Sequence, residues 1–148
     1  MLDPGLPLDQ LKSAYDNWRR TKGGNLDEVL DLFDDQIEMH SVLEPGVKHE
    51  LARVQTSRED TKKYFRELLD NWEMIDFPTD RVVEQGDTVV WIGRCTWRNR
   101  HTGIVVGTPK VDVWTFRDGI AVGMLEMFDT VGFARGAGLL QQLAAEIR

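Results

Sequence analysis

The stretch from Val111 to Phe116 places a carboxylate beside large aromatic side chains at the spacing of a β-strand. Alternate residues of a strand point to the same face, so Asp112, Trp114 and Phe116 share one. Aromatic residues favour the interior, where a carboxylate is costly unless it is paired, hydrogen-bonded or neutralised. Two interpretations follow. A protonated Asp112 could donate a hydrogen bond to a bound molecule, or Asp112 could accept hydrogen bonds from buried groups and only fix the sheet.

A second acid stands at the end of the last predicted strand. Leu125, Met127 and Asp129 share one face of that strand, and Glu126 belongs to the opposite face. At the rim of an apolar pocket, Asp129 could act as a general acid or base in proton transfer. Alternatively, Asp129 caps a turn or helix that begins near Thr130, because Asp is a favoured N-cap residue.

The elements that position these acids follow from the periodicity of the apolar residues. Spacings of three and four predict helices over residues 7–21, from Asn25 onward, and after the capping residue Ser57. A strand is expected at residues 36–42 and a loop at 43–55. From Glu73 onward the period is two, which indicates four strands in a meander.

The tail and the overall arrangement can also be predicted. Leu139, Leu140, Leu143 and Ile147 have helical spacing, so we expect an extra C-terminal helix that docks on the body. Three helices followed by a curved, mostly antiparallel sheet form an α+β fold, in which the helices cover the concave face. We expect residues 1–148 to form a single domain.

Composition excludes several classes of function. The chain has 148 residues and a formal net charge of −7 with scattered basic residues, which argues against nucleic acid as a partner. No stretch approaches the roughly 18 apolar residues of a membrane span and the start lacks a signal-peptide pattern, so we expect a cytoplasmic protein without a membrane partner. The histidines match no zinc motif, so no metal site is predicted, and Cys95 is expected to be an ordinary core thiol.

The order of elements and the residues that mark it resemble the superfamily of ketosteroid isomerase, SnoaL-like polyketide cyclases and nuclear transport factor 2. The resemblance spans about residues 11–138. It is carried by Tyr15 with Trp18, Asn25-Leu26-Asp27, Leu32-Phe33-Asp34-Asp35, Gly86-Asp87-Thr88-Val89, the run from Asp112 to Gly119, and Phe128-Asp129. It implies a cone-shaped barrel around a deep apolar pocket, and homodimers formed through the outer sheet face.

The resemblance also implies roles for individual residues. In the isomerase branch, a carboxylic acid matching Asp112 and a tyrosine matching Tyr15 donate hydrogen bonds to the substrate oxygen. In SnoaL-like cyclases, an aspartate matching Asp129 is the acid or base. The general base of the isomerases lies at the end of the first strand, where this chain has Ser41, which cannot abstract a proton unaided.

Strand parity and the resemblance together predict a pocket for a small, hydrophobic, cyclic ligand. Its expected lining comprises Trp18, Phe33, Met39, Ser41, Phe65, Trp91, Trp114, Leu125 and Met127. The leading hypothesis is an isomerase- or cyclase-like enzyme that needs no cofactor, in which Asp129 transfers a proton of a carbonyl compound while Asp112 and Tyr15 stabilise the oxyanion. The alternatives are a carrier of an apolar ligand and a dimeric protein-interaction module.

Overall fold

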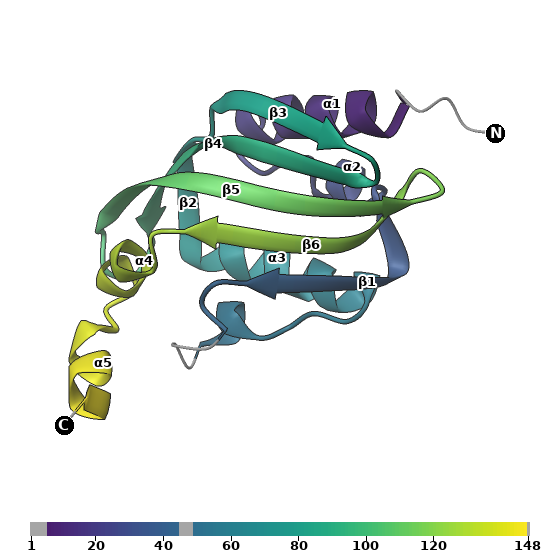
Figure 1. The fold of residues 1–148 in the computed structure, drawn as a ribbon. Helices are drawn as coiled ribbons and strands as arrows, with labels where there is room; N and C mark the ends of the chain where they lie inside the picture. Colours follow the sequence, from purple (N-terminus) through teal and green to yellow (C-terminus); the bar gives the residue numbers. More distant parts are fainter. Residues whose placement is uncertain (1–5, 45–48, 148) are drawn as a thin grey trace.

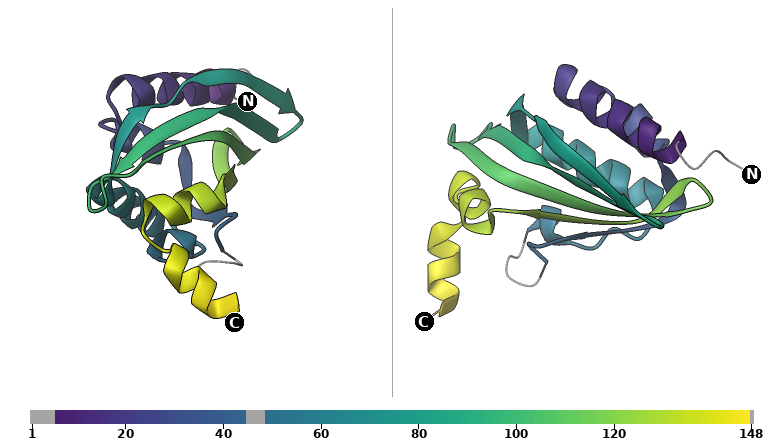
Figure 2. Two further views of the ribbon diagram at one scale, coloured as in Figure 1. Left: turned by 90° about the vertical axis from the view of Figure 1, so that its left-hand side faces the viewer. Right: turned by 45° about the horizontal axis from the view of Figure 1, so that its top comes forward.

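The computed structural model describes residues 6–44 and 49–147 and has the predicted α+β architecture. A curved sheet of six strands wraps around a core, and the N-terminal helices lie against its concave side (Figures 1 and 2). No helix in the described ranges is long and apolar enough to span a membrane.

Three helices line the concave side, as the periodicity predicts. They are α1 (Leu6–Arg20), α2 (Leu26–Leu30) and α3 (Arg58–Asn71), and a short 3-10 helix, η1 (Glu50–Ala52), precedes α3. The Ser57 side chain accepts a hydrogen bond from the Asp60 backbone N–H and so caps α3. The buried face of α1 carries Leu11, Tyr15 and Trp18, which are all less than a tenth exposed.

The sheet contains one strand before α3 and five after it. The strands are β1 (Phe33–Ser41), β2 (Trp72–Asp76), β3 (Thr79–Gln85), β4 (Thr88–Asn99), β5 (Val105–Arg117) and β6 (Ile120–Phe128). Their order is β1-β6-β5-β4-β2, β3 also pairs with β4, and only the β1–β6 pairing is parallel. This arrangement differs from the predicted meander of four strands, because the long β4 pairs with both β2 and β3.

The break between β2 and β3 occurs at Phe77-Pro78. Proline has no N–H to donate to a ladder, so pairing is interrupted there. The Pro78 carbonyl oxygen instead lies over Gly93 of β4, where an added Cβ atom would stand only 2.3 Å from it. Glycine is therefore required at position 93 for the chain to cross so closely.

Two helices end the described chain. α4 (Thr130–Gly136) packs on the sheet, where Gly136 lies close to Val106 and Trp72. α5 (Leu140–Ile147) extends away from the sheet (Figures 1 and 2) and contributes no buried residue. The prediction that Leu139, Leu140, Leu143 and Ile147 dock on the body holds for Leu139, which packs against the core, but none of the residues of α5 itself is buried.

Candidate active site

A cavity of about 110 Å3 lies between the concave face of the sheet and the helices. A water molecule requires about 10–15 Å3 measured in this way, so the space would hold several. Most of the lining is aromatic or aliphatic, and the polar side chains that reach it come mainly from β5 and β6. The aromatic part of the lining comprises Tyr15, Trp18, Tyr64, Phe65, Trp72, Phe77, Trp97, Trp114, Phe128 and Phe133.

Strand register places two acids opposite each other at this cavity. Asp112 of β5 pairs with Glu126 of β6, and both side chains are almost completely buried. Lys110 stands two residues before Asp112 and therefore shares its face of β5. Like charges directly opposite on neighbouring strands destabilise a sheet, so the two carboxylates need a cation between them.

Lys110 supplies that cation. Its ammonium nitrogen donates a hydrogen bond to Asp112 Oδ1 and lies 3.3 Å from Glu126 Oε2. The Lys110 side chain is 10% exposed, and those of Asp112 and Glu126 are 1% and 6% exposed. The ammonium group also lies 5.6 Å from the centre of the Phe77 ring and 5.9 Å from that of Trp91, within cation–π range.

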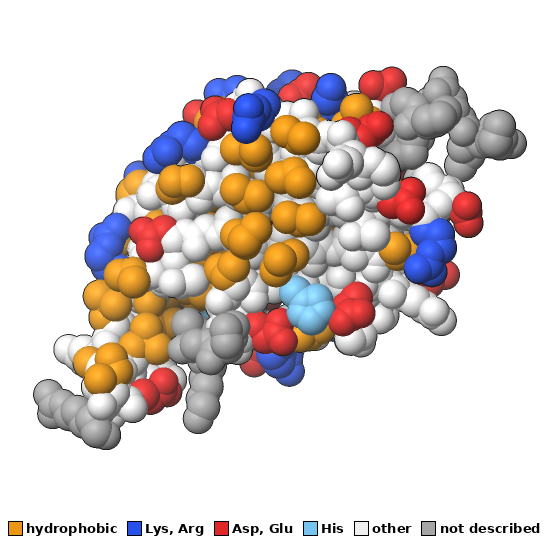
Figure 3. Space-filling view, in the orientation of Figure 1, with side chains coloured by type: hydrophobic (Ala, Val, Ile, Leu, Met, Phe, Trp, Pro, Cys, Tyr) orange, Lys and Arg blue, Asp and Glu red, His pale blue; other side chains and the backbone are white. Residues whose placement is uncertain are grey.

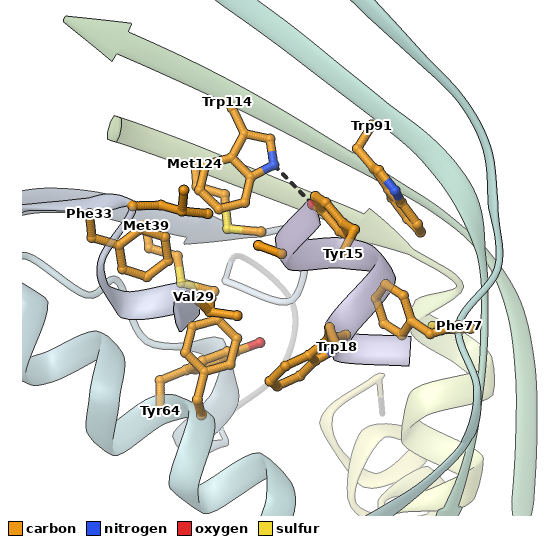
Figure 4. Close-up of a cluster of buried hydrophobic side chains, with 14 of the residues drawn as sticks. Tyr15, Trp18, Val29, Phe33, Met39, Tyr64, Phe77, Trp91, Trp114 and Met124 are labelled. Atoms are coloured by element: carbon orange, nitrogen blue, oxygen red, sulfur yellow. Dashed lines mark hydrogen bonds between the residues drawn. The ribbon is translucent and has the colours of Figure 1, made fainter. Parts of the chain in front are cut away.

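Two tyrosines complete the arrangement from the helices. Tyr15 of α1 donates a hydrogen bond to Asp112 Oδ2 at 2.5 Å and accepts one from Trp114 Nε1 at 2.9 Å (Figure 4). Tyr64 of α3 donates a hydrogen bond to Glu126 Oε1. We call Tyr15, Tyr64, Lys110, Asp112 and Glu126 the buried polar cluster.

Burial sets the protonation of this cluster. Burial raises the pKa of Glu126, Lys110 acts in the opposite direction, and the neighbouring Asp112 adds to the effect of burial. Burial alone would lower the pKa of Lys110, but Asp112 and Glu126 together hold it above its ordinary value, so Lys110 remains an ammonium. The pKa values of Tyr15 and Tyr64 are raised by burial and by their carboxylate partners, which keeps both as phenols that donate.

The sequence matches the family profile described as a SnoaL-like domain over residues 13–124. The chain belongs to the SnoaL-like domain family. No match was found among curated proteins.

Solved structures share the fold of this SnoaL-like domain. An NTF2-like protein from Burkholderia thailandensis superposes with a TM-score of 0.76 and 22% identity, covering 93% of this chain and 98% of that one. TerC, co-crystallised with polyporic acid, superposes with a TM-score of 0.73 and 21% identity, covering 89% of this chain and 98% of that one. A candidate SnoaL-like polyketide cyclase from a Jannaschia species superposes with a TM-score of 0.71 and 16% identity, covering 92% of this chain and 95% of that one. The domain therefore has the NTF2-like cone fold.

The environment of Asp112 differs from the predicted proton donor. Tyr15 and Lys110 both donate to Asp112, so in this SnoaL-like domain Asp112 acts as an acceptor. This arrangement is close to the alternative in which Asp112 accepts hydrogen bonds from buried groups.

Asp129 lies at the mouth of the cavity and is exposed to solvent. Its Oδ1 accepts a hydrogen bond from the Gly132 backbone N–H at 3.0 Å, which makes Asp129 the N-cap of α4. The structure thus shows the capping alternative. The acid that β6 places inside the cavity is Glu126.

Leu125 and Met127 do not line the cavity, contrary to the parity prediction. The inward residues of this stretch of β6 are Met124 and Glu126, and Leu125 is 37% exposed on the outer face. Pairing between β5 and β6 shifts near the start of β6, where Thr115 pairs with Gly123 and Phe116 pairs with Ala121. From Gly123 to Phe128 the pairing is regular, so the prediction chose the wrong face of the strand: both faces of β6 are apolar, and alternation alone does not identify the inner one.

The remaining predicted lining residues divide into two groups. Trp18, Phe65 and Trp114 line the cavity. Phe33, Met39, Ser41 and Trp91 are buried but lie behind the cavity wall. Trp91 stacks on Tyr15 with ring centres 4.5 Å apart, so it supports the buried polar cluster from the back (Figure 4).

Lys110 and Glu126 are absent from the sequence-based site, although a signal for each was present. Lys110 is two residues from Asp112 and so had to share its face, and Glu126 interrupts the apolar row of Met124 and Phe128. Burial raises the pKa of Cys95 to about 11, in agreement with an unreactive core thiol. Within residues 6–44 and 49–147, no group of three metal-binding side chains comes together.

Proposed function

We propose that this SnoaL-like domain is an enzyme that works without a cofactor and transfers a proton on a small hydrophobic carbonyl compound. The observation that carries the proposal is the pair of buried carboxylates, bridged by Lys110, at the polar end of an otherwise apolar cavity. Charged groups held in such surroundings with perturbed pKa values are typical of catalytic sites.

Glu126 is the proposed proton acceptor. It lines the cavity, and burial moves its pKa above the ordinary value of a glutamate, toward the range in which a carboxylate is an effective base at neutral pH. Asp129 does not fit this role as well, because its Oδ1 is engaged in capping α4 and its side chain is exposed.

Lys110 is the proposed electrophile. An ammonium group has three N–H bonds, and contacts with Asp112 and Glu126 use two of them. The third can be donated to a ligand oxygen, where negative charge develops as the carbon loses its proton. When Glu126 takes up that proton, the remaining charges of Lys110 and Asp112 cancel, and the enolate faces a neutral cluster.

Tyr15 and Asp112 are then positioning residues. Asp112 holds the ammonium of Lys110, and Tyr15 holds Asp112 while accepting a hydrogen bond from Trp114. These hydrogen bonds fix Lys110 before the ligand binds, so little reorganisation is needed during the reaction. Among the structures that share the fold, one bears the name of a candidate polyketide cyclase, which supports a ring-containing ligand.

The test is hydrogen–deuterium exchange at the carbon next to the carbonyl of 1-tetralone, followed by NMR in D2O. The wild-type domain should accelerate exchange above buffer, and Glu126→Gln should lower the enzymatic rate by about 10²–10⁴-fold. Glu73→Gln, at a half-exposed carboxylate outside the cavity, is the matched control and should exchange at the wild-type rate. Wild-type exchange at the buffer rate, or full activity of Glu126→Gln, would contradict the proposal.

A carrier of an apolar ligand is the second candidate. It is favoured by the fact that every fully buried side-chain N or O atom of the described residues already has a hydrogen-bond partner within the chain. A cluster satisfied in this way can hold the sheet together without acting on a ligand. A carrier would bind 1-tetralone in the cavity and leave its exchange rate unchanged.

We also propose that the outer sheet face binds a second copy of the chain. Apolar side chains form rows across β4, β5 and β6 on this face (Figure 3), and strand pairing aligns Val90 with Val113 and Val113 with Leu125.

Analytical ultracentrifugation tests the dimer. Val113→Lys should convert the protein to a monomer, because it places a charge in the centre of the patch. Gln10→Lys, which adds the same charge on the exposed side of α1, should leave the mass unchanged. A wild-type protein that is monomeric throughout would contradict the interface.

A further inference from the structure

We infer that the cavity selects uncharged ring compounds and rejects compounds of the same shape that carry a negative charge. The inference deepens the proposed function, because it rests on the same cavity being the ligand site. It concerns binding alone, however, and does not require that the ligand reacts.

The first argument is the charge of the lining. Three acids, Asp112, Glu126 and Asp129, reach the cavity, and Lys110 is the only basic residue among the described residues that line it. By formal charge, the lining therefore has three acidic groups against one basic group. An anionic ligand would therefore meet repulsion that the wall does not offset.

The second argument is that the charge of Lys110 is already matched. Its nitrogen contacts Asp112 Oδ1 and lies 3.3 Å from Glu126 Oε2. An anion that accepted the third N–H would also lie close to both carboxylates, so attraction and repulsion would largely cancel. A neutral carbonyl or hydroxyl group could use the same N–H without that repulsion.

The third argument is desolvation. The rest of the lining is apolar and aromatic, so an anion would lose its water without gaining replacement donors. Aromatic ring faces carry partial negative charge and favour cations or neutral rings over anions. Flat, neutral ring systems lose little on leaving water and can pack against Trp18, Trp97 and Trp114.

Rejection of anions is compatible with an enolate intermediate. An enolate formed inside the cavity leaves its proton on Glu126, so the total charge of cavity and ligand does not change. A ligand that arrives as an anion instead adds its own charge to that of the cavity. The cavity can therefore stabilise a transient oxyanion and still disfavour a permanent one.

The experiment compares 2-naphthol with 2-naphthoate at pH 7 by quenching of tryptophan fluorescence. We expect 2-naphthol, which is uncharged, to bind at least about tenfold more tightly. Glu126→Gln removes one acidic group. It should lower the ratio of the dissociation constant of 2-naphthoate to that of 2-naphthol by about threefold or more, mainly through tighter binding of 2-naphthoate. Glu73→Gln should keep the wild-type ratio.

A second measurement avoids any substituted protein. The affinity of wild-type protein for 6-cyano-2-naphthol, whose hydroxyl ionises in mildly alkaline solution, should fall as that hydroxyl loses its proton. Equal or tighter binding of the anionic forms would overturn the inference, and so would failure of both naphthalenes to bind. If selectivity is seen but 1-tetralone exchanges at the buffer rate, the catalytic proposal fails and the charge selection stands.

Discussion

Replacement of Lys110 by methionine tests the energetic role of the buried polar cluster. Methionine keeps most of the length of the side chain but removes the ammonium, so Asp112 and Glu126 would face each other across adjacent strands without a counterion. Removing one partner of a buried ion pair costs about 3–5 kcal/mol. A domain of this kind is stable by about 5–15 kcal/mol in total, so Lys110→Met should be severely destabilised.

The assay is urea unfolding followed by tryptophan fluorescence at pH 7. The matched control is Arg53→Met, which removes an ion pair with Glu50 that has a short N···O distance of 2.6 Å but side chains 73% and 62% exposed. Exposed pairs contribute at most about 1 kcal/mol, so the control should unfold almost as the wild type does. A cost below about 1 kcal/mol for Lys110→Met would refute the reasoning.

The loss of unfolding free energy in Lys110→Met, relative to the wild type, should also depend on pH. Loss of Lys110 removes the charge that opposes the rise in the pKa of Glu126, so that pKa should rise further in the folded state. When the folded state holds an acid with a raised pKa, it binds more protons than the unfolded state, and stability falls as pH rises through that window. The loss of unfolding free energy in Lys110→Met should therefore be smaller at pH 5 than at pH 7.

Further substitutions at four positions give distinct results. Asp129→Ala should lower the free energy of unfolding by about 1 kcal/mol through loss of the α4 cap but leave deuterium exchange intact. Asp129→Asn should preserve both the stability and the exchange rate. Loss of exchange in Asp129→Asn would restore Asp129 as the acid or base. Gly93→Ala should cost about 1–3 kcal/mol, because its Cβ atom would lie 2.3 Å from a backbone oxygen, while Gly123→Ala, with no neighbour nearer than 3.5 Å, should change the unfolding midpoint little. Hydrogen bonds that the His40 ring donates to Glu44 and Glu38 raise the pKa of His40, so its small stabilising contribution should be present below pH of about 6.5 and lost as pH rises through the folded pKa. His40→Gln should remove that dependence, and NMR titration of the ring would show directly whether the pKa is raised.

The fold could be predicted largely because local periodicity determines most of its elements. The cap at Ser57, the buried face of α1 and the inward row of β4 each follow from residues a few positions apart. The pairing of β4 with two strands could not be predicted, since it depends on the chain crossing between Pro78 and Gly93.

The site could be predicted only in part. The resemblance brought Tyr15 and Asp112 together, and the structure joins them by a hydrogen bond. Lys110 changes the role of that pair. Instead of donating hydrogen bonds to a ligand, Tyr15 donates to Asp112, and Asp112 accepts from Lys110. Glu126 was assigned to the outer face, because both faces of β6 are apolar and Asp129 was predicted to point inward.

A crystal structure of the domain with 2-naphthol would test the central claim most directly. We predict that the ring lies in the cavity between the sheet and the helices, with its hydroxyl oxygen within hydrogen-bonding distance of Lys110 Nζ or Glu126. A ring bound elsewhere on the domain, with the cavity unchanged, would contradict the assignment of the buried polar cluster as the ligand site.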